Sequence, residues 1–80
     1  MTLTEIRKGL PPRVSEWVDA VLAGEQNVNL ARRTGVTADT AATYATFFAQ
    51  VCGLDIPTRS VREAVLRMRI SELEAANGRP

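Results

Sequence analysis

The chain has 80 residues, of which 45% are hydrophobic and 24% are charged, and its ten Lys and Arg against nine Asp and Glu give a net charge of +1. This length predicts one domain over residues 1–80, and the apolar fraction excludes a disordered tail. The near balance of charge excludes a strongly basic protein, so any affinity for DNA must come from local placement of cations. The absence of a leader-like or long apolar run predicts a cytoplasmic protein with no membrane partner.

The first predicted element is a short helix that begins after Thr2. Thr2 and Glu5 have the spacing of a capping box, in which a hydroxyl and a carboxylate bind free backbone amides at the start of a helix. We expect this helix to end near Lys8, because Gly9 and the pair Pro11–Pro12 follow it and proline disfavours helical backbone before it.

The second predicted helix covers residues 12–23 and ends at Gly24. Its apolar side chains recur at steps of three and four, which predicts one stripe that faces the core and contains Val14, Trp17, Val18, Val21 and Leu22. The phase of Trp17 with the valines favours a core position over a contact with a partner.

Residues 27–52 carry the most informative pattern, which is two helices separated by a glycine turn. Asn27 or Asn29 is expected to cap the first helix, and Gly35 to end it in the left-handed conformation. Thr37 is expected to cap the second helix, and the small Ala31 lies where the two helices would cross. This is the layout of a helix-turn-helix.

The second helix of this motif is expected to reach about Cys52, where Gly53 and the segment 55–57 end it. Its predicted core face contains Ala41, Tyr44, Ala45, Phe48, Val51 and Cys52. Phe47 lies off that face and is expected to be an exposed partner contact beside a smooth strip of small residues, which are Ala38, Ala42, Thr46 and Ala49.

The run from Leu30 to Thr37, with Thr40 and Tyr44 behind it, resembles the helix-turn-helix of small bacterial and phage transcription regulators. It is similar to the motif of mercury-resistance-type regulators. The resemblance covers about 20 of the 80 residues. It implies an all-α fold of four to five helices around this motif, and double-stranded DNA as the partner.

On this interpretation the second motif helix lies in the major groove of DNA. The outward residues predicted for it include no Arg, Lys, Asn or Gln, the types that bind purines with two hydrogen bonds, so we expect modest sequence specificity. Each arginine has an equally weighted alternative as a solvated surface charge, paired with an acid such as Glu63 or Glu72. The residues expected at the groove or its edges are Thr37, Asp39, Thr40 and Thr43. The expected phosphate contacts are Arg13, Arg32 and Arg33, together with Arg7 and Lys8 near the start of the chain.

The last predicted helix covers about residues 60–76 and opens with a second capping box, Ser60 to Glu63. Its apolar residues form two stripes, roughly 130° apart. We expect one stripe to face the core and the other to need a second surface, which predicts a homodimer, while a wide face buried within one subunit is the alternative. The first stripe is Val61, Ala64, Val65 and Met68, and the second is Leu66, Ile70 and Leu73.

The sequence offers little for catalysis. It contains no histidine, which removes the usual general base and the commonest zinc ligand. Cys52 is expected to be an inert core residue, and Glu72 and Glu74 to be solvated acids that point in different directions. We therefore expect no enzyme, no metal, no cofactor and no small-molecule ligand.

The sequence thus predicts a small DNA-binding transcription regulator, repressor-like and of phage or actinobacterial type, that binds a paired-site operator as a homodimer. The alternative is a helix-turn-helix scaffold used as a protein-interaction module, such as a phage-encoded adaptor or inhibitor of a host protein. That alternative would use Phe47 and the alanine strip, and the small net charge favours it.

Overall fold

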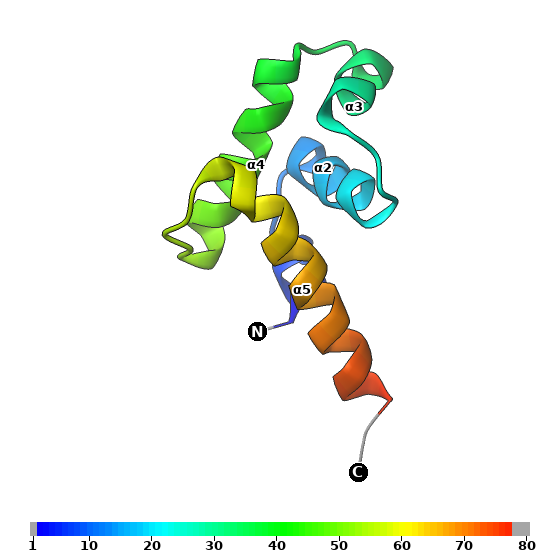
Figure 1. The fold of residues 1–80 in the computed structure, drawn as a ribbon, viewed down its shortest axis with the longest axis vertical. Helices are drawn as coiled ribbons and strands as arrows, with labels where there is room; N and C mark the ends of the chain where they lie inside the picture. Colours follow the sequence, from blue (N-terminus) through cyan, green and yellow to red (C-terminus); the bar gives the residue numbers. More distant parts are fainter. Residues whose placement is uncertain (1, 78–80) are drawn as a thin grey trace.

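The computed structural model describes residues 2–77, which contain five helices joined by short connections. The described range contains no strand, and the predicted all-α fold with a central helix-turn-helix and a long C-terminal helix is confirmed (Figure 1). The helices are α1 (Leu3–Lys8), α2 (Pro12–Leu22), α3 (Asn27–Thr34), α4 (Ala38–Cys52) and α5 (Thr58–Ala76).

Local signals in the sequence fix several helix ends. The capping box at the start of α1 is confirmed, since Thr2 Oγ1 accepts from the Glu5 amide at 3.2 Å and the Thr2 amide donates to Glu5 Oε1 at 2.9 Å. Gly53 ends α4 with φ 69°, and the next amide, of Leu54, donates to the Ala49 carbonyl at 2.8 Å. Such a bond satisfies a carbonyl that the helix leaves free.

Two predicted caps are wrong. α3 begins at Asn27 after Gln26, with no side-chain cap, and Asn27 Oδ1 instead accepts a hydrogen bond from Trp17 Nε1 at 3.2 Å. α5 begins at Thr58 after Pro57, three residues earlier than the expected capping box at Ser60 allows. The fixed φ of proline, −58° at Pro57, suits the residue that precedes a helix, so the helix starts there without a side-chain cap.

The core is centred on α2, which contacts α3, α4 and α5. Trp17 is 1% exposed and meets the buried ring of Phe48 with centroids 5.9 Å apart. The predicted stripe of α2 is confirmed, because Val14, Val18 and Val21 are buried with Trp17. This arrangement joins the N-terminal half of the chain to α4 through one aromatic contact.

The buried face of α4 differs from the prediction. Ala49 is 6% exposed and belongs to the core, whereas Val51 is 51% exposed, so both assignments were wrong. The reason is the approach of α5, which packs on the alanine side of α4 and brings Thr58 Oγ1 within 3.1 Å of Thr46 Oγ1. Small side chains permit that close approach, and the face that includes Val51 is left to solvent.

α5 divides its apolar residues as the two stripes predict. Val61 and Val65 are fully buried, and Met68 packs against the core. The second stripe, Leu66, Ile70 and Leu73, is exposed, so the alternative of one wide face buried within the subunit is wrong. The last turns of α5 extend past the other helices (Figure 1).

Glu72 connects α5 to the start of α1. Its Oε2 accepts from the Thr4 amide at 3.0 Å and from Thr4 Oγ1 at 2.8 Å, and its Oε1 accepts from Arg69 Nη1 at 2.8 Å. The expectation of a solvated acid is therefore wrong, because this carboxylate satisfies an amide in the first turn of α1. The hydrogen bond from the Thr4 amide is the main cause that lowers the pKa of Glu72, followed by that from the Thr4 hydroxyl.

The lowered pKa of Glu72 predicts a pH-dependent contribution to stability. The contribution is fully present above the unfolded-state pKa, about 4.3, and is lost as the pH falls through the lower pKa of the folded state. Glu72→Gln is expected to be less stable at neutral pH and to lose less unfolding free energy than the parent between neutral pH and about pH 3. Urea unfolding followed by circular dichroism measures both.

Glu74→Gln is the matched control, because the Glu74 side chain makes no hydrogen bond or ion pair within residues 2–77. Its acid dependence should equal that of the parent. If Glu72→Gln and Glu74→Gln unfold with the same pH dependence, Glu72 does not hold α1 to α5.

Candidate nucleic-acid interface

α3 and α4 form a helix-turn-helix around Gly35. Gly35 has φ 77° and ψ 18°, the left-handed conformation that the sequence predicts, and its amide donates to the Ala31 carbonyl. The next amide, of Val36, also donates to that carbonyl at 3.0 Å. Residues 35–37 are therefore enough to end α3, reverse the chain and begin α4.

The first turns of α4 present a threonine surface. Thr37 caps the helix as predicted, since its Oγ1 accepts from the Thr40 amide at 3.1 Å. The Thr37 hydroxyl donates to Thr40 Oγ1 at 3.0 Å, and the Thr43 hydroxyl donates to the Thr40 carbonyl at 2.5 Å. Thr37, Asp39, Thr40 and Thr43 are all exposed. Because two hydroxyl protons are used within α4, that of Thr40 is the one left to donate to a ligand.

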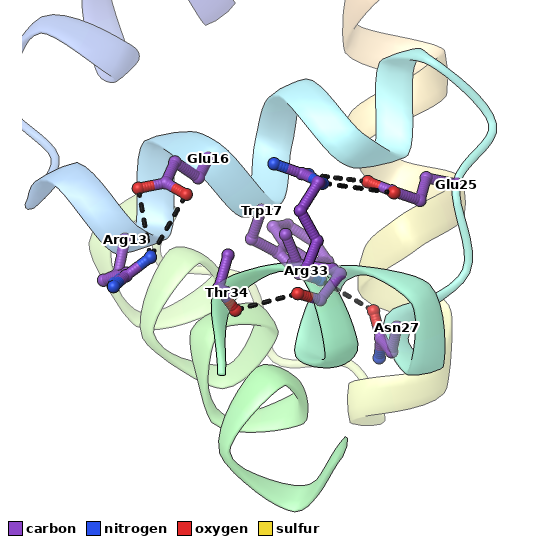
Figure 2. A network of polar contacts seen from close by, with 8 residues as sticks. Arg13, Glu16, Trp17, Glu25, Asn27, Arg33 and Thr34 are labelled. Atoms are coloured by element: carbon purple, nitrogen blue, oxygen red, sulfur yellow. Dashed lines mark hydrogen bonds and ion pairs between the residues drawn. The ribbon is translucent and has the colours of Figure 1, made fainter. Parts of the chain in front are cut away.

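Arg33 is held by an acid at the end of the α2–α3 connection. Its Nη2 donates to Glu25 Oε1 at 2.7 Å and its Nε to Glu25 Oε2 at 3.4 Å, and Figure 2 shows the side chain reaching from α3 to that carboxylate. This hydrogen bond raises the pKa of Arg33 and lowers the pKa of Glu25. A phosphate at Arg33 would have to compete with Glu25.

Arg32 and Arg13 differ in their surroundings. Arg32 is exposed in the last turn of α3 and makes no ion pair or hydrogen bond within the part of the chain that the structure describes. Arg13 Nη1 lies 3.4 and 3.3 Å from the two oxygens of Glu16. Both distances exceed the 2.7–2.9 Å of a strong charge-assisted bond, so this exposed pair is weak.

The alternative of surface pairing is confirmed for two arginines of α5. Arg67 pairs with Glu63 four residues before it, and Arg69 pairs with Glu72 three residues after it. Arg7, near the end of α1, pairs with Asp19 of α2. These arginines are therefore paired between and along helices, and within residues 2–77 Arg32 and Lys8 are the predicted phosphate contacts without such a partner.

A hollow that the sequence did not predict lies between the start of α2 and the middle of α4, residues 43–50. Its volume is about 410 Å³. It brings Arg13 and Thr43 next to Phe47, which is 40% exposed as predicted. We call it the α2–α4 hollow; its lining residues are Pro11, Arg13, Val14, Thr43, Tyr44, Thr46, Phe47 and Gln50.

Phe47 was the one signal for this hollow in the sequence, since it stands off the core face of α4. The expected neighbour of Phe47 was the alanine strip, of which Thr46 does line the hollow with Phe47, whereas Ala49 is buried in the core. Gln50, an exposed amide in this hollow, was also missed. Leu66, Ile70 and Leu73 lie apart from it on α5.

The described residues contain no group of three or more His, Cys, Asp or Glu arranged to hold a metal ion. Cys52 is half-buried against the core, and burial raises the pKa of its thiol, which disfavours the reactive thiolate. Within residues 2–77, no helix is long and apolar enough to cross a bilayer.

Comparisons with protein-family models, with curated protein sequences and with solved structures gave no match.

The turn at Gly35 predicts a specific cost of substitution. A Cβ added there would meet no atom within 4 Å, so Gly35→Ala creates no clash. Its only expected cost is the strain of a left-handed backbone at a non-glycine residue. For a left-handed residue that loss is about 1–2 kcal/mol of unfolding free energy. Chemical unfolding followed by Trp17 fluorescence measures the loss.

Gly9→Ala is the control, because Gly9 has φ −97° and a Cβ there would meet only the Ile6 carbonyl, at an ordinary 3.8 Å. We expect it to be nearly neutral. Equal losses for the two substitutions would contradict a left-handed requirement at Gly35.

Proposed function

We propose that this protein is a small transcription regulator that binds double-stranded DNA through α3 and α4. The observation that carries the proposal is the α3–α4 unit itself, in which a three-residue turn joins α3, whose last turn exposes an unpaired Arg32, to α4, whose first turns expose threonines. The resemblance of residues 30–44 to regulator motifs supports the same function. In such a unit the second helix lies in the major groove while cations of the unit contact phosphates.

The charges of this unit predict modest affinity. Arg32 is available for a phosphate, Arg33 must exchange Glu25 for one, and Asp39 would be repelled by the DNA backbone. The threonine methyl groups fit thymine methyl groups, and the Thr40 hydroxyl can donate to a phosphate. Thr37, Thr40 and Thr43 would thus read DNA weakly, and most of the binding energy would come from phosphates.

The proposal includes a homodimer and a cytoplasmic site of action. Leu66, Ile70 and Leu73 form an exposed apolar stripe on a helix that extends past the core, and a second copy of the chain would cover it. Two copies would bind a paired-site operator, and occupation of promoter DNA would repress transcription.

A second candidate function is a protein-interaction module, such as a phage-encoded adaptor or inhibitor of a host protein. The α2–α4 hollow favours it, because it exposes Phe47 beside several polar side chains. The net charge of +1 favours it as well.

The DNA proposal predicts opposite effects at two charged positions, the unpaired Arg32 and the Glu25 that pairs with Arg33. Arg32→Ala should weaken binding to random duplex DNA on all sequences alike and lower the slope of log affinity against log salt by about one. Glu25→Gln should strengthen binding, because it releases Arg33 for a phosphate. Gel-shift titrations at several salt concentrations measure both, starting at low salt, where nonspecific binding should appear at about 10⁻⁴ to 10⁻⁶ M or tighter.

Arg67→Ala removes the same charge from α5, away from the α3–α4 unit, and serves as the control with an unchanged slope. If the parent protein gives no shift at low salt, the DNA proposal is wrong. If Arg32→Ala keeps the parent slope, its assigned contact is wrong.

The dimer predicts that charge on the apolar stripe dissociates the protein. Leu66→Glu or Ile70→Glu should reduce the mass measured by light scattering from that of two chains to that of one, because a buried unpaired carboxylate is costly. Val51→Glu places the same charge on an exposed apolar position of α4 and should leave the mass unchanged. A parent protein with the mass of one chain would rule out the dimer.

A further inference from the structure

The α2–α4 hollow has an apolar floor and a polar rim. Val14 is buried and Tyr44 is half-buried at this hollow, while Phe47, which also lines it, is 40% exposed. Arg13, Thr43, Thr46 and Gln50 stand exposed around these residues. A small apolar floor inside a ring of hydrogen-bonding groups is typical of the centre of a protein interface, where one large side chain is desolvated.

The aromatic side chains of the hollow determine which kind of side chain can bind on its apolar floor. Tyr44 and Phe47 are three residues apart on α4, so their rings lie on neighbouring positions of the same side of the helix. An exposed aromatic ring gains most from a large apolar side chain that covers it. The volume of about 410 Å³ holds such a side chain with the backbone that carries it.

The positive charge at the rim of the hollow indicates a second property that a bound molecule would need. Arg13 is the one charged residue among those that line the hollow, and it is half-exposed. Its contacts with Glu16 are long, at 3.3 and 3.4 Å, and an exposed pair of this kind contributes about 0–1 kcal/mol. A partner's carboxylate beside that apolar side chain can therefore replace Glu16 as the ion-pair partner of the Arg13 guanidinium at a small cost in free energy.

These features distinguish a protein from nucleic acid as the occupant. One cation among eight lining residues would neutralise at most one phosphate, and a phosphate backbone would leave Phe47 uncovered. We infer that the α2–α4 hollow is the docking site for a protein partner that presents a large apolar side chain beside an Asp or Glu. The apolar side chain covers Phe47 and Tyr44, the carboxylate pairs with Arg13, and Gln50 bonds to the backbone of the partner.

The location of the hollow links this partner to DNA. Arg13 and Thr43 line the hollow and are also among the residues assigned to DNA. A partner seated there covers both, so partner and DNA exclude each other. This regulatory consequence rests on the proposed DNA-binding function, whereas the docking site itself does not.

The test is selection of random dodecapeptides, displayed on phage, against the whole 80-residue protein. The enriched sequences should share a large apolar residue next to an Asp or Glu. A synthetic peptide with that sequence should bind in solution by fluorescence anisotropy, and replacing its acid by Lys should abolish binding. Phe47→Ala and Arg13→Ala should each weaken the peptide at least about tenfold.

Two controls keep the test specific. Arg67→Ala removes a paired arginine outside the hollow, and Val51→Ala removes an exposed apolar side chain of α4 outside it, so both should bind the peptide like the parent. Because Phe47 and Arg13 are both exposed, the circular dichroism of their variants should match the parent. Selection without enrichment, or a peptide that binds the Phe47 and Arg13 variants like the parent, overturns the docking site.

The competition step separates the two proposals. Peptide binding is measured without DNA, so a failure to bind DNA overturns the regulator and leaves the docking test intact. If both ligands bind alone, added peptide should release the duplex in a gel shift. A complex that contains peptide and DNA together overturns the mutual exclusion.

Discussion

The indole of Trp17 contacts two other elements at once, and the arrangement of α2, α3 and α4 follows from that. Its ring meets Phe48 of α4, and its Nε1 donates to Asn27 at the start of α3. A buried N–H must find a partner, because leaving it unpaired costs about 1–3 kcal/mol. The start of α3 is thereby fixed against α2, while Gly35 fixes how α4 leaves α3. The orientation of the α3–α4 unit depends on these two constraints.

Different sides of α4 contact different parts of the molecule or are exposed to solvent. One side is buried on the core, and the side with Ala49 lies under the start of α5. Its first turns expose threonines, and its middle forms the wall of the α2–α4 hollow with Phe47. Because α4 has these several contact surfaces, its sequence has few side chains of the types that bind bases. Part of its exposed surface suits a protein better than a duplex, and the proposed regulator would use both parts of that surface in turn.

Sequence reasoning succeeded for most of the local signals, although the expected side-chain caps of α3 and α5 are wrong. The caps at Thr2 and Thr37 and the glycine ends at Gly35 and Gly53 depend on residues within one or two turns, and all four were predictable. It failed where distant elements meet. The exposure of Ala49 and Val51 depends on where α5 packs, and the role of Glu72 depends on the distant Thr4.

The candidate site shows the same division. The turn, the threonine face and the exposed Phe47 could be predicted, because each depends on one helix or one turn. The pairing of Arg33 with Glu25 and the hollow beside Arg13 could not be predicted, since both require the packing of α2 against the elements that follow it.

Whether α3 and α4 bind DNA can be measured by titrating isotope-labelled protein with a random duplex and following its amide NMR signals. The account predicts shifts concentrated between Arg32 and Thr43. Signals that stay unchanged, or that move only on α5, would contradict it.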